Sequence, residues 1–404
     1  MEKSTAAESL NAETLEPIET INLRVPESST SSRRLQVVAE WDRITFDLQG
    51  DSEREYLEKE VFEKVLMQGV KVDSEGNIYV STARWGGRQI PSTVSQVVKG
   101  DEGPKLQPFP SKEFNEPGNA EALQSVLGFE IDRNDVMWIL DQGHIGGRSS
   151  PPGAEKVVLW DLKAGRELQR YVFEKESDNE SSFLNDIVVD NDTGYAYITD
   201  SGNSSEPVQG GLIVYDSNKD RARRVLDSTV FTNDQPGFRF RIKNRPVLKE
   251  SPMRTGADGI ALSGDKKTLY WTNLSGEKLY ALPTATLRDF STTEADIRSS
   301  VRIVGDLPSN TDGMACDREG NLYMTALQLN GILLRKKEGS KSSIFVSHPE
   351  MVWPDTLGWH DGWLYVTSNK LNFWNDGAVS FQNPEFPNFR IWRIYTGGRS
   401  YLHP

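Results

Sequence analysis

The sequence is poor in cysteine, in histidine and in long apolar runs. Of its 404 residues, one is a cysteine, Cys316, and four are histidines. A single cysteine excludes an intramolecular disulfide, and its place in the apolar run Gly-Met-Ala-Cys predicts a buried, unreactive thiol. The apolar runs fall short of the roughly 18 residues that a membrane-spanning helix needs, so no membrane partner is expected.

Positive charge is also in short supply. The chain has 46 lysines and arginines against 59 aspartates and glutamates, which gives a formal net charge of −13. Proteins that bind nucleic acid need a basic face for the phosphates, so this balance argues against nucleic acid as a partner. It is compatible with a neutral or cationic small ligand.

Several motifs of known chemistry are missing as well. No glycine-rich loop leads from a strand into a helix, so no nucleotide cofactor is expected. Neither the Gly-X-Ser-X-Gly motif of serine hydrolases nor the spacing of zinc ligands occurs. The N-terminal residues lack the apolar segment of a signal peptide. The sequence as given predicts a cytoplasmic protein, or a secreted one if this N-terminus results from processing.

The chain divides into a short tail and one large domain. Residues 1–30 are polar and rich in Ser, Thr and Glu, which predicts a disordered N-terminal tail. Residues 31–404 form the domain. No segment in it carries a sustained helical period, whereas short runs rich in Val, Ile, Tyr and Trp are bounded by Gly, Asp, Asn and Pro. These features predict an all-β domain.

One pattern, a strand followed by a polar turn and a second strand, recurs along the chain. Its six copies are 67–82, 126–141, 184–200, 257–273, 311–326 and 354–369. Each copy continues into a third strand, and four of them into a fourth, at 168–173, 221–227, 302–307 and 343–348. Six four-stranded units of about 40–60 residues predict a six-bladed β-propeller.

The sixth unit needs a fourth strand from elsewhere. Its third strand, 389–394, is followed only by a segment unsuited to a strand. The N-terminal segment 35–46 alternates apolar and polar residues and belongs to no repeat. We expect it to complete the last blade, because this would close the ring and cover an exposed sheet edge.

Alignment of the six copies brings one residue of each to the start of the innermost strand. These residues, here called the axial column, are Gln68, Leu127, Asn185, Asp258, Asp312 and Asp355. Matched positions of innermost strands surround the propeller axis, so the polar members are candidate ligand-binding residues. Three carboxylates in a narrow channel repel one another, and something must offset that repulsion.

Three explanations of these carboxylates stay open. Asn185, Asp258 and Asp312 are candidate ligands of Ca²⁺ or another divalent cation, which binds through oxygen atoms. Alternatively, Asp258 and Asp312 are catalytic acid–base groups, and at least one of them keeps a proton at a raised pKa. In the third explanation each Asp caps its own turn by accepting backbone N–H bonds.

Two loops carry further candidates. His144 follows the second strand of the second copy and is a candidate catalytic base, although an ordinary hydrogen-bonded histidine fits the same position. The segment 228–256 is the widest gap between copies and combines three phenylalanines with arginines. It predicts either a lid over the channel or a solvated surface loop.

The sequence resembles the major royal jelly protein/Yellow family over about residues 35–395. The resemblance rests on Arg84-Trp85 within 82–98, on the block 257–289 and on Trp-Pro-Asp-Thr-Leu-Gly-Trp at 353–359. It implies a six-bladed propeller whose channel binds small, often aromatic or amine-bearing, molecules, with links to pigment chemistry. Arg84 and Trp85 become candidate ligand-binding residues.

A more distant similarity is to the regucalcin/gluconolactonase family of metal-dependent lactonases. That family's metal ligands, Glu, Asn and Asp, carry over onto four members of the axial column: Gln68, Asn185, Asp258 and Asp312. Gln68 replaces the Glu, and Asp258 replaces an Asn.

The expected function is binding of a small organic molecule in the channel. Its isomerisation or tautomerisation in a pigment or specialised-metabolite pathway is part of this expectation. The alternatives are a divalent-metal-dependent lactonase or hydrolase and a non-catalytic binding propeller.

Overall fold

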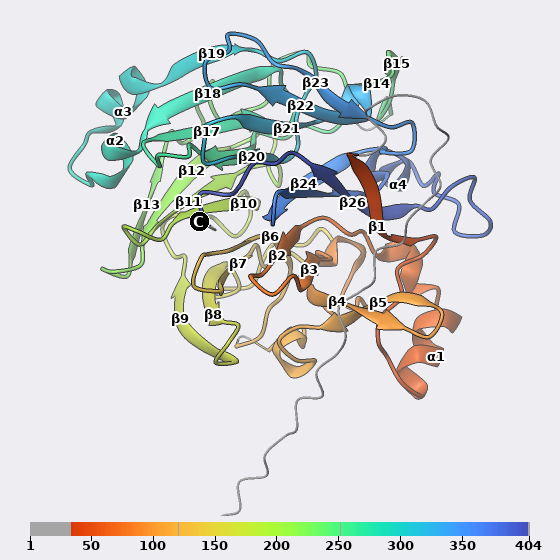
Figure 1. Ribbon diagram of the computed structural model, residues 1–404. Helices are drawn as coiled ribbons and strands as arrows, with labels where there is room; N and C mark the ends of the chain where they lie inside the picture. The colour runs from red at the N-terminus through yellow and green to blue at the C-terminus, as the bar shows by residue number, and fades with distance from the viewer. Residues whose placement is uncertain (1–33, 120, 251, 403–404) are drawn as a thin grey trace, which may run out of the picture.

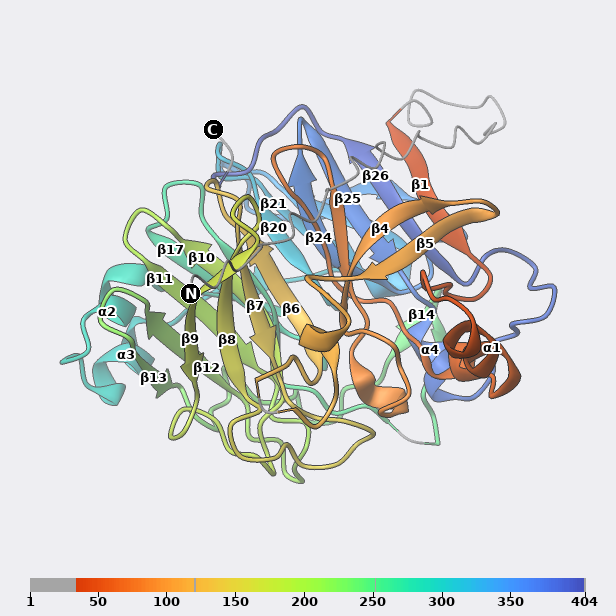
Figure 2. The same cartoon turned by 90° about the horizontal axis from the view of Figure 1, so that it is seen from below.

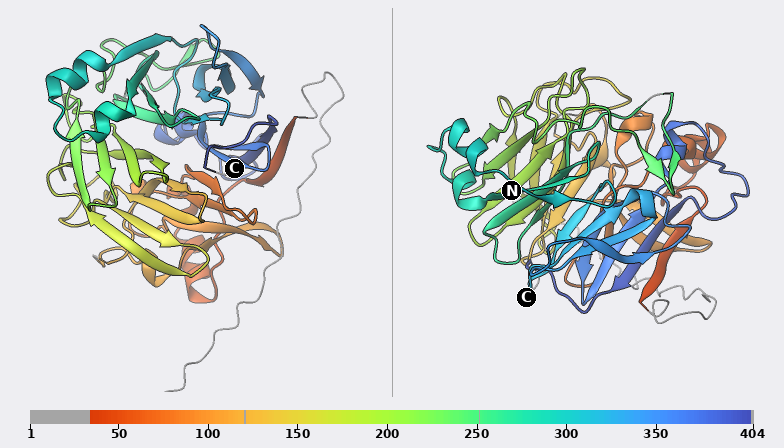
Figure 3. Two further views of the ribbon diagram at one scale, coloured as in Figure 1. Left: turned by 60° about the vertical axis from the view of Figure 1, so that its left-hand side comes forward. Right: turned by 90° about the horizontal axis from the view of Figure 1, so that it is seen from above.

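The structure is a computed structural model and describes residues 34–402, except residues 120 and 251. The predicted tail, 1–30, lies outside the described residues. Six four-stranded antiparallel sheets stand around a central axis as the blades of a propeller (Figure 1 and Figure 3, left). The predicted six-bladed β-propeller is therefore confirmed.

Each blade runs outward from an innermost strand beside the axis. In this order, blade 1 is β2 (Val70–Val72), β3 (Ile78–Ser81), β4 (Val94–Gly100) and β5 (Gly103–Pro108). Blade 2 is β6 (Val126–Ile131), β7 (Val136–Asp141), β8 (Lys156–Asp161) and β9 (Arg166–Val172). Blade 3 is β10 (Leu184–Asp190), β11 (Tyr195–Asp200), β12 (Gly211–Asp216) and β13 (Arg221–Val225).

The second half of the ring has the same plan. Blade 4 is β16 (Ala257–Leu262), β17 (Thr268–Asn273), β18 (Lys278–Pro283) and β19 (Arg302–Asp306). Blade 5 is β20 (Met314–Cys316), β21 (Leu322–Ala326), β22 (Gly331–Arg335) and β23 (Ser343–Ser347). Blade 6 is β24 (Pro354–His360), β25 (Trp363–Ser368), β26 (Phe389–Tyr395) and, from the other end of the chain, β1 (Leu35–Trp41).

Strand β1 closes the ring as predicted. It pairs antiparallel with β26, from Leu35 opposite Ile394 to Trp41 opposite Phe389. The indole of Trp41 donates a hydrogen bond to the carbonyl of Pro104 in blade 1, at 2.7 Å. Blade 6 thus holds both ends of the domain and also contacts the first blade, which leaves no gap in the ring.

The helices are short and lie outside the blades. They are α1 (Asp51–Glu58), α2 (Thr284–Arg288), α3 (Glu294–Ser300) and α4 (Leu371–Asn375), with 3-10 turns η1 (Val61–Lys64), η2 (Arg84–Gly86), η3 (Glu113–Asn115) and η4 (Leu327–Leu329). None has more than eight residues, which is too few to produce a helical period in the sequence. No helix in the described part of the chain is long and apolar enough to cross a membrane. Figure 3 shows α2 and α3 at the outer side of the ring.

The innermost strands lie unusually close together. A Cβ atom on Gly259 would lie 2.1 Å from the carbonyl oxygen of Asp312, and one on Gly313 would lie 2.2 Å from that of Asp355. Glycine is therefore required at these two positions, because a side chain would collide with the next blade. The close approach narrows the channel and brings the axial column together.

One end of the channel is closed by residues 398–402. The backbone N–H of Arg318 donates to the carbonyl of Arg399 at 2.8 Å, and Leu402 is buried. Ser400, Tyr401 and Leu402 border a small cavity of about 30 Å³ that is also lined by residues of all six innermost strands. The other end of the channel carries α4 and the hairpin of β14 (Arg241–Ile242) and β15 (Arg245–Pro246), which lie on the same side in Figure 2.

Candidate functional site: an acidic pocket on the propeller axis

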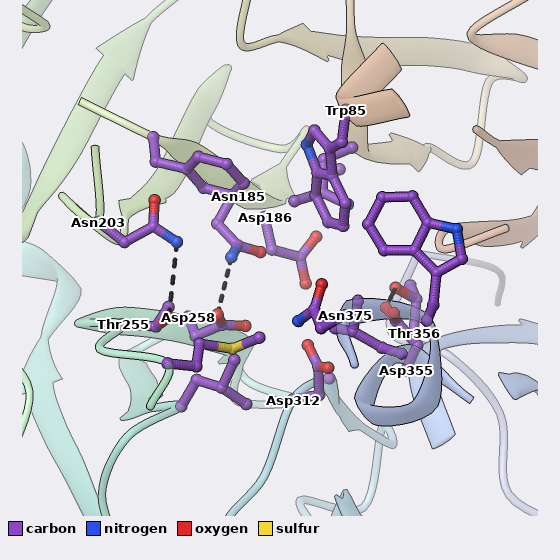
Figure 4. A pocket seen from close by; sticks show the side chains of 18 residues that line it. Trp85, Asn185, Asp186, Asn203, Thr255, Asp258, Asp312, Asp355, Thr356 and Asn375 are labelled. Carbon is purple, nitrogen blue, oxygen red and sulfur yellow. Dashed lines mark hydrogen bonds between the residues drawn. The ribbon is translucent and has the colours of Figure 1, made fainter. Parts of the chain in front are cut away.

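A cavity of about 250 Å³ occupies the channel on the side of α4. Five members of the axial column line it, as Figure 4 shows for its polar members: Leu127, Asn185, Asp258, Asp312 and Asp355. The sixth, Gln68, does not line it. Its buried side chain accepts a hydrogen bond from the backbone N–H of Ala83 at 3.0 Å, which gives it a structural role.

Asp258 and Asp312 are neighbouring carboxyl groups, and each one affects the pKa of the other. Two carboxyl groups so near each other repel when both are ionised, which favours a proton on at least one of them. The pair is held from both sides: the Asn185 amide donates to Asp258 Oδ2 at 2.8 Å, and the Trp353 indole donates to Asp312 Oδ2 at 2.7 Å. Phe240 stacks on Trp353, with ring centroids 5.7 Å apart, so the wide segment 228–256 supports the pair from behind.

The other two acids differ in how they are held. Asp355 accepts hydrogen bonds from Asn369 at 2.7 Å and from the Thr356 hydroxyl at 2.9 Å, one on each oxygen. Asp186, which the axial column did not include, also lines the cavity. Its Oδ1 accepts the backbone N–H of Ile187 at 2.8 Å, and its carboxyl group points into the cavity (Figure 4).

The four acids differ in charge. Burial raises the pKa of Asp258, Asp312 and Asp355 well above the ordinary value, and the nearby carboxyl groups raise each of them further. Burial raises the pKa of Asp186 to about 6, against the opposing effect of Lys71. The cavity therefore favours the protonated forms of Asp258, Asp312 and Asp355, whereas Asp186, with a pKa of about 6, is mostly ionised at neutral pH.

The turn-cap explanation does not describe these acids. Among the described residues, no backbone N–H donates to the carboxyl groups of Asp258, Asp312 or Asp355. The turn caps lie further along each hairpin. In blade 2, for example, Asp132 Oδ1 accepts the backbone N–H groups of Asn134 and Val136.

A divalent cation does not fit the site as it is arranged. The described residues contain no group of three or more His, Cys, Asp or Glu side chains that could hold a metal ion. Asn185 turns its NH₂ group, and not its carbonyl oxygen, toward Asp258. Ca²⁺ needs six to eight converging oxygen atoms, so the predicted Ca²⁺ stays a prediction that this geometry does not favour.

Aromatic and apolar side chains form part of the cavity wall. Trp85 and Phe183 lie together, with ring centroids 5.7 Å apart, and Trp374 of α4 lies on another side. Met253 and Thr255 of the segment 228–256 also line the cavity. This segment therefore contributes part of the wall, while its β14–β15 hairpin is exposed. No lysine, arginine or histidine is among the described residues that line the cavity.

A family model described as "Major royal jelly protein" matches residues 124–396, which is more than half of the chain. The chain belongs to the major royal jelly protein family. The resemblance seen in the sequence is thereby confirmed.

Individual relatives in this family are distant. Protein yellow of Drosophila erecta is 27% identical over 243 residues, which cover 56% of this chain and 42% of that protein. Major royal jelly protein 1 of Apis mellifera is 25% identical over 289 residues, or 66% of this chain and 62% of that protein. The chain thus spans about half the length of the curated relatives it matches.

Solved structures show the same fold at lower identity. A gluconolactonase from Xanthomonas campestris is 12% identical, covers 89% of both chains and gives a TM-score of 0.50. A calcium-binding regucalcin from Agrobacterium tumefaciens is 13% identical, covers 84% of this chain and 92% of its own, and gives 0.51. At such identities the likeness shows the propeller fold alone.

Besides Gln68, two further predicted site residues of this royal jelly family propeller do not reach the cavity. The first is Arg84, whose fully buried guanidinium donates to backbone carbonyls of Ile90, Leu123, Gln124 and Asn115. With its donors engaged in this way, Arg84 joins the loops of blades 1 and 2. Its neighbour Trp85 does line the cavity.

The second is His144, which lies behind Phe183, with ring centroids 6.4 Å apart. Its Nδ1 bonds the carbonyl oxygen of Arg148 at 3.0 Å, and its Nε2 lies 3.5 Å from Glu155 Oε1. Although burial lowers the pKa of His144, these contacts raise it above the usual value on balance. The imidazole of His144 is thus held next to Glu155 and is not among the residues that line the cavity.

Proposed function

We propose that the cavity binds a small organic molecule that carries an aromatic ring and a cationic, amine-type group. The observation behind this proposal is the charge of the lining. Its ionisable side chains are carboxyl groups, and the described lining residues supply no cation to pair with them. A protonated amine would provide that positive charge, and the rings of Trp85, Phe183 and Trp374 would stack on the aromatic part.

The test is calorimetric titration with tryptamine and with its neutral alcohol analogue, tryptophol. We expect the wild-type protein to bind the amine at least about tenfold more tightly, because only the amine carries a charge. Asp312→Ala removes the partner of both Asp258 and Trp353, and should weaken binding of both compounds by about tenfold or more. Equal affinity of the wild-type protein for amine and alcohol, or no binding of either, would reject the proposal.

The matched control is Asp376→Asn. Asp376 is an exposed carboxylate directly after α4, next to the cavity-lining residue Asn375. Its substitution changes the net charge near the mouth but nothing inside the cavity. We expect tryptamine affinity to stay within about twofold, since exposed charges are screened by salt.

A second candidate function is isomerisation or tautomerisation of the bound molecule. The neighbouring carboxyl groups of Asp258 and Asp312 favour it, because one carboxyl group can give a proton while the other accepts one. The metal-dependent lactonase receives support from the fold alone. If the protein binds the ligand but does not isomerise it, it is a non-catalytic binding propeller.

Proton transfer can be measured without knowing the natural substrate. Ligands with an acidic C–H next to a carbonyl, incubated in D₂O with the protein, should exchange that hydrogen for deuterium faster than in buffer. Asp258→Asn and Asp312→Asn should each reduce the enzymatic excess by about 10²-fold or more. Exchange that is no faster with wild-type protein than in buffer, by NMR, would count against catalysis and leave the binding proposal intact.

A further inference from the structure

A second ring of positions directly follows the axial column. Its members are Gly69, Gly128, Asp186, Gly259, Gly313 and Thr356. Four of the six are glycines, and the close approach of neighbouring innermost strands explains them. In blade 3 a charged side chain, that of Asp186, stands where these blades have none.

A bulge in β10 accounts for the direction of Asp186. The pairing of β10 with β11 shifts register between Leu184 and Ile187, so Asn185 and Asp186 together fill the shifted step. A bulge lets two consecutive side chains face the same side of a strand. Both Asn185 and Asp186 accordingly line the cavity (Figure 4).

Blade 2 leaves room for the Asp186 side chain. A Cβ atom on Gly128 would lie 2.7 Å from the Cα of Asp186 and 3.1 Å from its Oδ1. Any larger residue at position 128 would therefore push Asp186 out of place. Gly128 and Asp186 are therefore complementary. The missing side chain of Gly128 leaves the space on the adjacent strand that the side chain of Asp186 occupies.

Among the four acids that line the cavity, Asp186 is the one to which no described side chain donates a hydrogen bond; its one donor among the described residues is the backbone N–H of Ile187. Asp258, Asp312 and Asp355 each accept hydrogen bonds from side chains of the surrounding wall. Oδ2 of Asp186 receives no hydrogen bond from any residue between 34 and 402 that the structure describes. This oxygen belongs to a side chain that lines the cavity, where the ammonium group of a ligand could donate to it.

On its other side Asp186 faces a buried ion pair. Lys71 Nζ donates to Glu130 Oε2 at 3.1 Å and to the carbonyl of Leu357 at 3.0 Å. Both charged residues border the small cavity that residues 398–402 close. The positive charge of Lys71 opposes the effect of burial on Asp186 and favours its anionic form, while Glu130 has the opposite effect. The ion pair therefore lies on the closed side and the free oxygen on the open side.

Building on the proposed function, we infer that Asp186 is the specificity-determining residue, which binds the cationic group of the ligand through its free Oδ2. Asp258, Asp312 and Asp355 shape the cavity around that contact. The ligand class is then a primary or secondary ammonium compound whose charged end reaches the depth of β10. Its aromatic end lies toward Trp85 and Trp374.

The decisive variant is Asp186→Asn, which keeps the size of the side chain and removes the charge. We expect its preference for tryptamine over tryptophol to fall by at least about tenfold. Affinity for the neutral tryptophol should stay within about threefold of the wild-type value. The matched control is Asp376→Asn, which removes an exposed carboxylate outside the cavity lining, and it should keep the preference for the amine.

The outcomes separate this inference from the function on which it rests. If the wild-type protein prefers tryptamine and Asp186→Asn prefers it equally, Asp186 is not the anchor, and the proposed function stands. If Asp186→Asn loses both ligands to the same extent, its role is structural and the inference fails. If the wild-type protein shows no preference, the proposed function itself fails. A melting temperature measured for each variant verifies that it is folded.

Discussion

Lys156→Met is expected to lower the free energy of unfolding by about 3–5 kcal/mol. Lys156 and Asp141 are both fully buried, and Lys156 Nζ lies 3.0 Å from Asp141 Oδ2. Removing the ammonium group leaves a carboxylate in the protein interior without its counter-ion. Urea unfolding followed by tryptophan fluorescence measures the loss.

An exposed ion pair provides the control. Lys278 and Asp306 lie 2.9 Å apart on the surface, with side chains 42% and 77% exposed. Lys278→Met should change stability by less than about 1 kcal/mol, because solvent screens such pairs. The explanation fails if Lys156→Met is no more destabilising than this control.

The acid of the buried pair also holds backbone that leads into the site. Asp141 accepts the N–H groups of Gln124 at 2.7 Å and Ser125 at 2.8 Å, just before β6. Blade 3 repeats the arrangement: Asp200 accepts the N–H of Phe183 at 2.7 Å, just before β10. The double variant Asp141→Leu/Lys156→Met should therefore remain unstable, because it leaves these donors unpaired.

These contacts explain why two sets of acids in one repeat have different roles. The acid that ends the second strand, as in Asp141 and Asp200, anchors the loop ahead of the innermost strand. The acid that starts the innermost strand, as in Asp258 and Asp312, accepts no backbone N–H among the described residues. Its carboxyl group stays at the cavity, bonded to side chains.

The fold could be predicted because each blade repeats one local pattern. Alternating strands and polar turns are visible within about 16 residues, and each of the six copies supports the same interpretation. The position of strand β1 was also predictable. The N-terminal strand belonged to no repeat, and the sixth unit lacked a fourth strand. Helix α1 was not, because its eight residues carry a single buried side chain, that of Tyr56, and hence no period.

The site could be predicted only where it follows the repeat. Alignment was enough to bring Asn185, Asp258 and Asp312 to one axis. It was not enough for Arg84, whose acceptors come from loops up to 40 residues away, and no local pattern indicates that its donors are engaged. Gln68 shares the alignment, but it lies just ahead of β2 and bonds its own blade.

Asp186 was missed although the sequence contained a signal. Strict alternation along a strand turns every second residue to the axis, so an inward-facing Asn185 predicts an outward-facing Asp186. The bulge breaks that rule. The signal was an Asp at a position that is glycine in four other copies. Such a side chain needs space, which a neighbouring glycine, here Gly128, provides.

Asp258→Asn is expected to stabilise the protein at neutral pH while it impairs proton transfer. The pKa of Asp258 is raised in the folded state, first by burial and then by Asp355. A folded state with a raised acid pKa binds more protons than the unfolded chain, so its stability falls as pH rises above the unfolded pKa, about 4. Asparagine mimics the protonated acid and avoids this loss.

The pH dependence distinguishes this mechanism from a simple repacking effect. Near pH 4 both forms of position 258 are neutral, so wild-type protein and variant should melt at nearly the same temperature. The difference should widen toward pH 7–8 and reach roughly 2 °C or more, since each unit of pKa shift is worth about 1.4 kcal/mol. A gain that is constant with pH would mean that Asp258 is not protonated in the folded protein. The stability that wild-type protein gives up at neutral pH is then a consequence of keeping several acids around one cavity, as expected where function and stability conflict.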